Sequence, residues 1–135
     1  EKAFVLSYEK LEQEQRYVLH LKKYFIDQLT SRIPGVQFNG ACADLDKSTY
    51  TLLNVSLPLT QEQSLMLLFQ LDMQGIACSK GSACQSGSSQ ASHVLTELLS
   101  DTSRAANAIR FSLAHTNQAE EIDYAVNQLC ALIGK

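Results

Sequence analysis

Cys84 is the residue of this 135-residue chain whose sequence context is most suited to thiol chemistry. It lies in the segment 79–89, which holds five serines, two glycines and no large apolar side chain. That composition predicts a mobile surface loop. A cysteine reacts as its thiolate, which needs exposure and a nearby positive charge. Lys80 and His93 are candidates for that charge, although the sequence places neither of them. The context indicates a reactive thiol, with an incidental exposed cysteine as the alternative.

The cysteine spacings argue against a metal site. Cys42, Cys78, Cys84 and Cys130 are 36, 6 and 46 residues apart and include no C-x-x-C pair. We interpret Cys42 and Cys130 as small buried side chains. We expect all four to be reduced thiols of a cytoplasmic protein, because no secretion signal opens the chain. A Cys78–Cys84 disulfide switch is a minor alternative, since Cys78 is predicted to face inward from a strand.

Composition and charge limit the classes of protein to which the chain can belong. Apolar residues make up 45% of the sequence, which predicts a globular fold. Eleven basic and 14 acidic residues give a net charge of −3, which does not indicate a nucleic-acid surface. The longest apolar run, residues 65–69, is too short to cross a bilayer. We expect a single domain over residues 1–135, with neither a membrane nor a nucleic acid as partner.

The hydrophobic pattern predicts a two-layer α+β domain. Residues 8–31 place apolar side chains at helical spacing, with charges on the other face. Residues 50–57 alternate with a period of two, which is typical of a strand with two different faces. The sheet is expected to be mainly antiparallel, and the sequence leaves its strand order open. Its four predicted strands are residues 36–38, 50–57, 76–78 and 108–113.

Polar residues mark the starts of the later helices. Thr60 and Gln63 form a capping-box pattern ahead of an apolar run. Asn117 and Glu120 are predicted to cap the final helix in the same way. A short helix is expected around residues 94–99. The predicted element order is therefore α-β-β-α-β-α-β-α.

The segment that contains Cys84 resembles a known family. Residues 75–95 read GIACSKGSACQSGSSQASHVL and are similar to the active-cysteine segment of the NifS/IscS-type cysteine desulfurases. Asn-Val-Ser at 54–56, with the helix after it, is similar to the strand and helix that precede this loop in the family. Residues 109–113 and 120–124 are similar to the closing strand and helix. The resemblance covers nearly the whole chain and implies the C-terminal small domain of a PLP-dependent, class V aminotransferase-like enzyme.

The resemblance also implies roles for two residues. Cys84 matches the loop nucleophile that takes sulfur from PLP-bound L-cysteine, leaving alanine and an enzyme persulfide for iron–sulfur cluster biogenesis or other sulfur delivery. Arg110 matches the arginine that holds the substrate α-carboxylate, although a strand-end arginine without such a role is the ordinary alternative. Implied partners are L-cysteine, a sulfur-acceptor or Fe–S scaffold protein and, for the complete enzyme, a second copy in a homodimer.

The sequence departs from the family in its cofactor residues. The family's PLP lysine follows a histidine in the large domain, and none of the histidines here precedes a lysine. Lys80 lies inside the cysteine segment, so we reject it as the PLP lysine. No glycine-rich turn for the cofactor phosphate is recognisable. We therefore expect the PLP-binding large domain to be absent, and this chain alone to bind no PLP and to be inactive. Residues 114–115 are Ala-His where many relatives have Gly-Arg.

Other functions stay open at the level of sequence. A selenocysteine lyase or another class V aminotransferase-like enzyme would share the fold, although an aminotransferase has no need of the Gly-Ser-Ala-Cys thiol at 81–84. A stand-alone sulfur-carrier or docking domain is the non-enzymatic alternative, and it would use the same cysteine without a cofactor.

Overall fold

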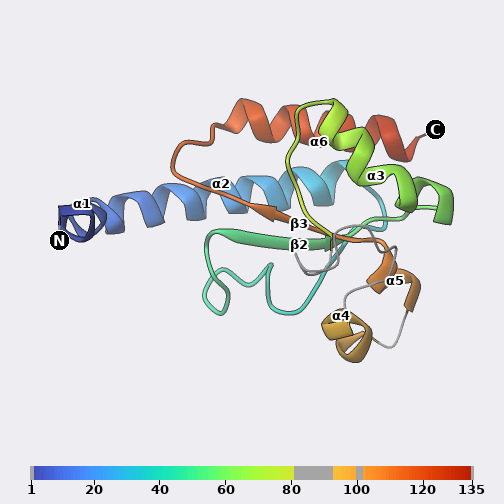
Figure 1. The fold of residues 1–135 in the computed structure, drawn as a ribbon, viewed down its shortest axis with the longest axis horizontal. Helices are drawn as coiled ribbons and strands as arrows, with labels where there is room; N and C mark the ends of the chain where they lie inside the picture. The colour runs from blue at the N-terminus through green and yellow to red at the C-terminus, as the bar shows by residue number, and fades with distance from the viewer. Residues whose placement is uncertain (1, 81–92, 100–101, 135) are drawn as a thin grey trace.

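The computed structural model describes residues 2–80, 93–99 and 102–134, and Figure 1 gives the arrangement of its elements. None of its helices is long and apolar enough to span a membrane within these described ranges. The elements in chain order are α1 (Lys2–Glu9), α2 (Leu11–Arg32), β1 (Gln37–Phe38), β2 (Leu52–Ser56), α3 (Gln61–Met73), α4 (His93–Leu98), α5 (Thr102–Ala106), β3 (Ala108–Ser112) and α6 (Ala119–Ile133).

The strands form a three-stranded antiparallel sheet in the order β1-β2-β3. The predicted α+β class and antiparallel sheet are confirmed, but the predicted strand at 76–78 is wrong. The start of this segment instead forms the C-terminal cap of α3. Gly75 adopts a positive φ of 74°, and the Ile76 N–H donates to the Leu71 carbonyl at 2.9 Å. The chain reaches β3 only at Ser79, which forms an isolated bridge with Arg110.

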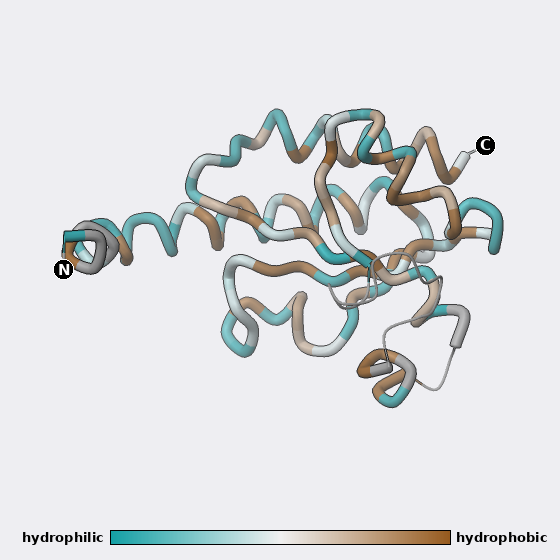
Figure 2. Tube along the Cα trace, in the orientation of Figure 1, coloured by the Kyte–Doolittle hydropathy of each residue, from teal (hydrophilic) through white to brown (hydrophobic). Residues whose placement is uncertain are grey.

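The core lies between one face of the sheet and helices α2, α3 and α6 (Figure 1). Alternate residues of β2 and β3 point into it, as the two-residue period of a strand requires. Phe25 of α2 meets Phe111 of β3 edge to face, with ring centroids 5.0 Å apart. Figure 2 shows hydrophobic stretches along β2 and β3. The core residues of β2 and β3, with the residue that follows each strand, are Leu53, Val55, Leu57, Ile109, Phe111 and Leu113.

The helix starts confirm one predicted cap and correct the other. Thr60 and Gln63 form the expected capping box, with hydrogen bonds of 3.2 and 2.9 Å. The box of α6 lies one residue later than predicted, at Gln118 and Glu121. The Asn117 amide is occupied elsewhere: it accepts from the Ala114 N–H at 2.9 Å and donates to Glu121 at 3.0 Å. Asn117 therefore closes the turn between β3 and α6.

The first helical region is also divided differently from the prediction. Instead of one helix over 8–31, α1 ends at Glu9 and α2 begins at Leu11. Lys22 of α2 is fully buried, and its ammonium donates to Ser48 Oγ and the Thr49 carbonyl, both at 2.8 Å. Burial lowers the pKa of Lys22. This buried lysine fixes the loop that leads from β1 into β2.

Candidate functional site

Arg110 lies on the sheet face opposite the core. In β3 the residues on either side of it are buried, whereas Arg110 itself is half-buried. Its partner in the register is Asn54 of β2. The N–H and carbonyl of Arg110 point away from β2, so the two residues form a non-hydrogen-bonded pair, whose side chains lie close together. Within the described part of the chain, no hydrogen bond or ion pair occupies the Arg110 guanidinium, which leaves it available to an anion.

The segment that leads to Cys84 meets the sheet at this arginine. Ser79 N–H donates to the Arg110 carbonyl at 3.0 Å, and Arg110 N–H donates to the Ser79 carbonyl at 2.7 Å. Cys84 follows Ser79 by five residues. Cys84 itself lies outside the described residues, as does most of the predicted loop at 79–89. The chain therefore leaves the sheet toward the cysteine motif from the strand position that holds Arg110.

Lys80 is fixed to α3. Its ammonium donates to Ser64 Oγ at 2.7 Å and to the Ser64 carbonyl at 3.0 Å, and burial lowers its pKa. Sequence reasoning left the place of this cation open. Ser64 holds Lys80 at the start of the cysteine motif, whereas the side chain of His93 lies outside the described part.

A hydrogen-bonded network that sequence reasoning missed lies beside Arg110. Asn39, which is buried, donates from Nδ2 to Asn54 Oδ1 and to Ser56 Oγ, both at 2.8 Å. Arg104 donates from Nε to Asn39 Oδ1 at 3.0 Å and from its terminal nitrogen to the Phe38 carbonyl at 2.9 Å. The polar residues at 54 and 56 on one strand face were a partial signal. Nothing in the sequence pattern predicted α5, which carries Arg104.

The three cysteines within the described residues are buried or half-buried. Cys42 is buried, as predicted, and its thiol donates to the Asn54 carbonyl at 3.0 Å. Cys130 is half-buried rather than fully buried. Cys78 is half-buried in an irregular segment, and burial, with the Asp72 carboxylate adding to it, raises its pKa to about 11. A thiol with such a pKa is almost entirely protonated near neutral pH.

Alkylation of Cys78 tests this environment. At pH 8, we expect iodoacetamide to modify Cys78 at least about tenfold more slowly than glutathione, because three pH units below a pKa leave roughly one thiolate in a thousand. The rate should continue to rise through pH 10. Site-resolved mass spectrometry gives the rate, with Cys78→Ser as the control for peak assignment. A rate that levels off below pH 9 would contradict the raised pKa.

The described lysines are either held by protein oxygens or exposed. A PLP-binding lysine needs a free amine beside space for the cofactor. The amines of Lys22 and Lys80 are held by serine and backbone oxygens. Lys47 is 77% exposed and pairs with Asp44 at 3.3 Å. The other described lysines are exposed. Neither Lys22 nor Lys80 therefore presents a free amine to a cofactor.

A direct cofactor test follows. We expect this chain, once circular dichroism shows that it is folded, to give no borohydride-reducible adduct concentrated at one lysine when it is mixed with PLP. The amines of Lys22 and Lys80 are engaged by protein oxygens, and the other described lysines are exposed. Peptide mapping after reduction measures the distribution of adducts. A low, even spread over exposed lysines agrees with the expectation, whereas a stoichiometric adduct at Lys22 or Lys80 would overturn it.

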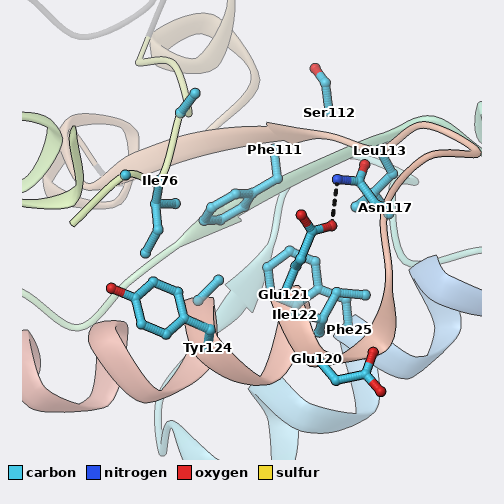
Figure 3. Close-up of a pocket in the computed structure, with 13 residues that line it drawn as sticks. Phe25, Ile76, Phe111, Ser112, Leu113, Asn117, Glu120, Glu121, Ile122 and Tyr124 are labelled. Carbon is cyan, nitrogen blue, oxygen red and sulfur yellow. Dashed lines mark hydrogen bonds between the residues drawn. The ribbon is translucent and has the colours of Figure 1, made fainter.

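A cavity of about 560 Å³ lies on the helix side of the sheet and is separate from Arg110. Figure 3 shows it between Ile76, the end of β3 and the start of α6. Glu120 and Glu121 line it, and the hydrogen bond from Asn117 lowers the pKa of Glu121, with the Gln118 N–H adding to this effect. Two carboxylates make the cavity unsuited to an anionic substrate, so we place the candidate site at Arg110.

Comparison with known proteins identifies the family. Residues 3–125 match the family described as aminotransferase class-V. This chain belongs to that family. The sequence is 35% identical over 130 residues to the cysteine desulfurase IscS of Rickettsia typhi, covering 96% of this chain and 30% of that protein. The IscS of Photobacterium profundum is 34% identical over 133 residues, at 98% and 31% coverage.

Solved structures give the same fold for this class-V chain. A NifS-like protein from Rickettsia africae superposes with a TM-score of 0.73 at 20% identity, over 94% of this chain and 31% of that one. A second NifS-like protein gives a TM-score of 0.75 at 23% identity, over 98% and 32%. The class-V chain thus spans about 30% of the length of the curated relatives, and the family implies PLP in complete enzymes.

Proposed function

We propose that this chain is the C-terminal small domain of a cysteine desulfurase, with Cys84 as sulfur acceptor and Arg110 as the ligand of the substrate carboxylate. The observation that carries the proposal is the two-bond bridge between Ser79 and Arg110. It joins the residue two positions before the Gly-Ser-Ala-Cys motif to an arginine whose guanidinium has no partner within the described ranges. The identity to IscS proteins over nearly the whole chain supports the same assignment.

The proposed reaction transfers sulfur from L-cysteine to Cys84. The Cys84 thiolate attacks the sulfur of L-cysteine, and a sulfur–sulfur bond forms as the substrate carbon–sulfur bond breaks. The electron pair of the broken bond stays on carbon, which takes up a proton to give alanine. Arg110 holds the carboxylate through two parallel N–H donors and so fixes the substrate during transfer. PLP, which we expect the large domain of the complete protein to bind, is the group that the family uses to stabilise charge on substrate carbon.

The wider setting is part of the proposal. In the complete protein we expect a PLP-binding large domain, a homodimer and a cytoplasmic location. The persulfide would pass to a sulfur-acceptor or Fe–S scaffold protein. These expectations rest on the similarity to IscS proteins, of which the chain covers about 30%.

Persulfide mapping on the complete protein tests the proposal. After incubation with L-cysteine, a mass increase of one sulfur should appear on the peptide that contains Cys84, together with an equal amount of alanine. Persulfide on Cys84 that is transferred from a low-molecular-weight persulfide donor, without alanine production, would favour a sulfur carrier. Much faster turnover of L-selenocysteine than of L-cysteine would favour a selenocysteine lyase. Transamination without persulfide would place the protein with the aminotransferases.

A further inference from the structure

We propose that Asn54 is a second substrate-binding residue, whose amide N–H donates to the same carboxylate that Arg110 binds. This inference rests on the proposed function and adds to it a specificity residue on the neighbouring strand. The substrate class that fits the pair is an amino acid with a free carboxylate, since the Arg110 guanidinium and the Asn54 NH₂ group would both donate to its oxygens.

The register brings the two side chains together. Asn54 and Arg110 are opposite each other in the β2–β3 ladder. The backbone N–H of Asn39 donates to the Asn54 carbonyl at 3.0 Å. The backbone N–H and carbonyl of Arg110 are both hydrogen-bonded to the backbone of Ser79. Asn54 and Arg110 thus turn their backbone groups away from one another, which makes them the close, non-hydrogen-bonded kind of pair. Both project from the face of the sheet opposite the core, so one small anion can contact both.

The orientation of the Asn54 amide follows from the network behind it. A guanidinium can only donate, so the atom of Asn39 that faces Arg104 Nε at 3.0 Å must be its oxygen. The other branch of the Asn39 amide is then Nδ2, which donates to Asn54 at 2.8 Å. The atom of Asn54 that receives this bond must be Oδ1. Arg104 therefore determines, through Asn39, that the remaining branch of the Asn54 amide is its NH₂ group.

That NH₂ group is available to a ligand. Its oxygen is directed toward Asn39, beyond the end of β1, so the nitrogen on the opposite branch is directed away from β1. Within the described residues, no protein acceptor takes a hydrogen bond from Asn54 Nδ2. Asn54 is half-buried, which is enough to limit competition by water while leaving the donor reachable. Ser56 completes the support by accepting from Asn39 and donating to the Arg104 carbonyl, both at 2.8 Å.

Two variants of the complete protein distinguish the role of the Asn54 amide donor from the role of Asn39, which orients it. Asn54→Ala removes the donor and should weaken binding of L-alanine, the reaction product, by about tenfold. Asn39→Asp keeps the shape but replaces the donor Nδ2 with an acceptor. Asn54 must then turn its NH₂ inward and present its oxygen to the carboxylate. We expect a similar or larger loss, although Asn39→Asp touches no substrate.

The measurements are the Kd of L-alanine by calorimetry, its ratio to the Kd of L-alaninamide, and KM and kcat for L-cysteine. Both variants should lower the preference for carboxylate over carboxamide and raise KM more than they lower kcat. Asn127→Ala, which removes an exposed asparagine of α6, is the matched control and should change nothing. If Asn39→Asp fails to fold, Asn54→Ala alone decides.

The outcomes distinguish this inference from the proposed function. An unchanged carboxylate preference in Asn54→Ala, with persulfide on Cys84 and a loss of binding in Arg110→Ala, would overturn the role of Asn54 alone. Wild-type protein that forms no persulfide and shows no carboxylate preference would overturn both. A tenfold loss in Asn54→Ala with an intact Asn39→Asp would overturn the orientation by Arg104 and Asn39.

Discussion

Replacing Cys84 with serine in the complete protein should abolish sulfur transfer from L-cysteine, by at least roughly 10³-fold, while substrate still binds. A serine hydroxyl is weakly nucleophilic near neutral pH, and it cannot hold sulfur as a persulfide. Binding should persist because the proposed carboxylate ligand, Arg110, lies on β3 and is unchanged. The measurement is alanine formed per minute, together with a mass-spectrometric map of persulfide over all four cysteines.

The three other cysteines provide matched serine controls. Cys42→Ser keeps a hydroxyl donor for the Asn54 carbonyl, so packing loss should be the main effect. Cys78→Ser removes a thiol whose pKa is about 11 and which is therefore rarely a thiolate. Cys130→Ser alters a half-buried position on α6. All three should keep most of the sulfur-transfer rate. Persulfide on Cys78, with an unchanged rate in Cys84→Ser, would move the nucleophile to a different residue.

The sequence predicted the elements that are set by local chemistry. Apolar spacing predicted α2, and the capping pair Thr60 and Gln63 predicted the start of α3. Alternation predicted β2 and its two faces. The strand expected at 76–78 is wrong because three apolar residues are also compatible with an irregular segment. Gly75 and the backbone bond from Ile76 to Leu71 determine which conformation forms.

The sequence predicted only part of the candidate site. The cysteine motif and Arg110 are local patterns, and family resemblance supplied their roles. The network from Arg104 through Asn39 to Asn54 joins residues 65 and 15 positions apart. No short pattern encodes such contacts, because they depend on the register of β1 and β2 and on where α5 packs. The direction of an amide depends on the donor behind it, which only the folded arrangement specifies.

Replacing Arg110 with alanine should weaken binding of L-cysteine and L-alanine by about 100-fold, which corresponds to roughly 3 kcal/mol. The variant loses a bidentate, charge-assisted hydrogen bond to the carboxylate. Arg110→Lys should recover only part of this loss, because an ammonium offers a point charge instead of a planar fork. Since Ser79 bonds only to the backbone of Arg110, both variants should keep the bridge that positions the cysteine segment.

The control for Arg110 is Arg32→Ala, which removes an exposed arginine that donates to Asn127 on α6 at 2.6 Å. It should leave binding unchanged, because it lies on helices away from the proposed site. The Kd ratio between L-alanine and L-alaninamide isolates the carboxylate contribution, which should nearly vanish in Arg110→Ala. A persistent preference for the carboxylate in that variant would mean that another cation binds it, and that Arg110 is an ordinary arginine at the end of a strand.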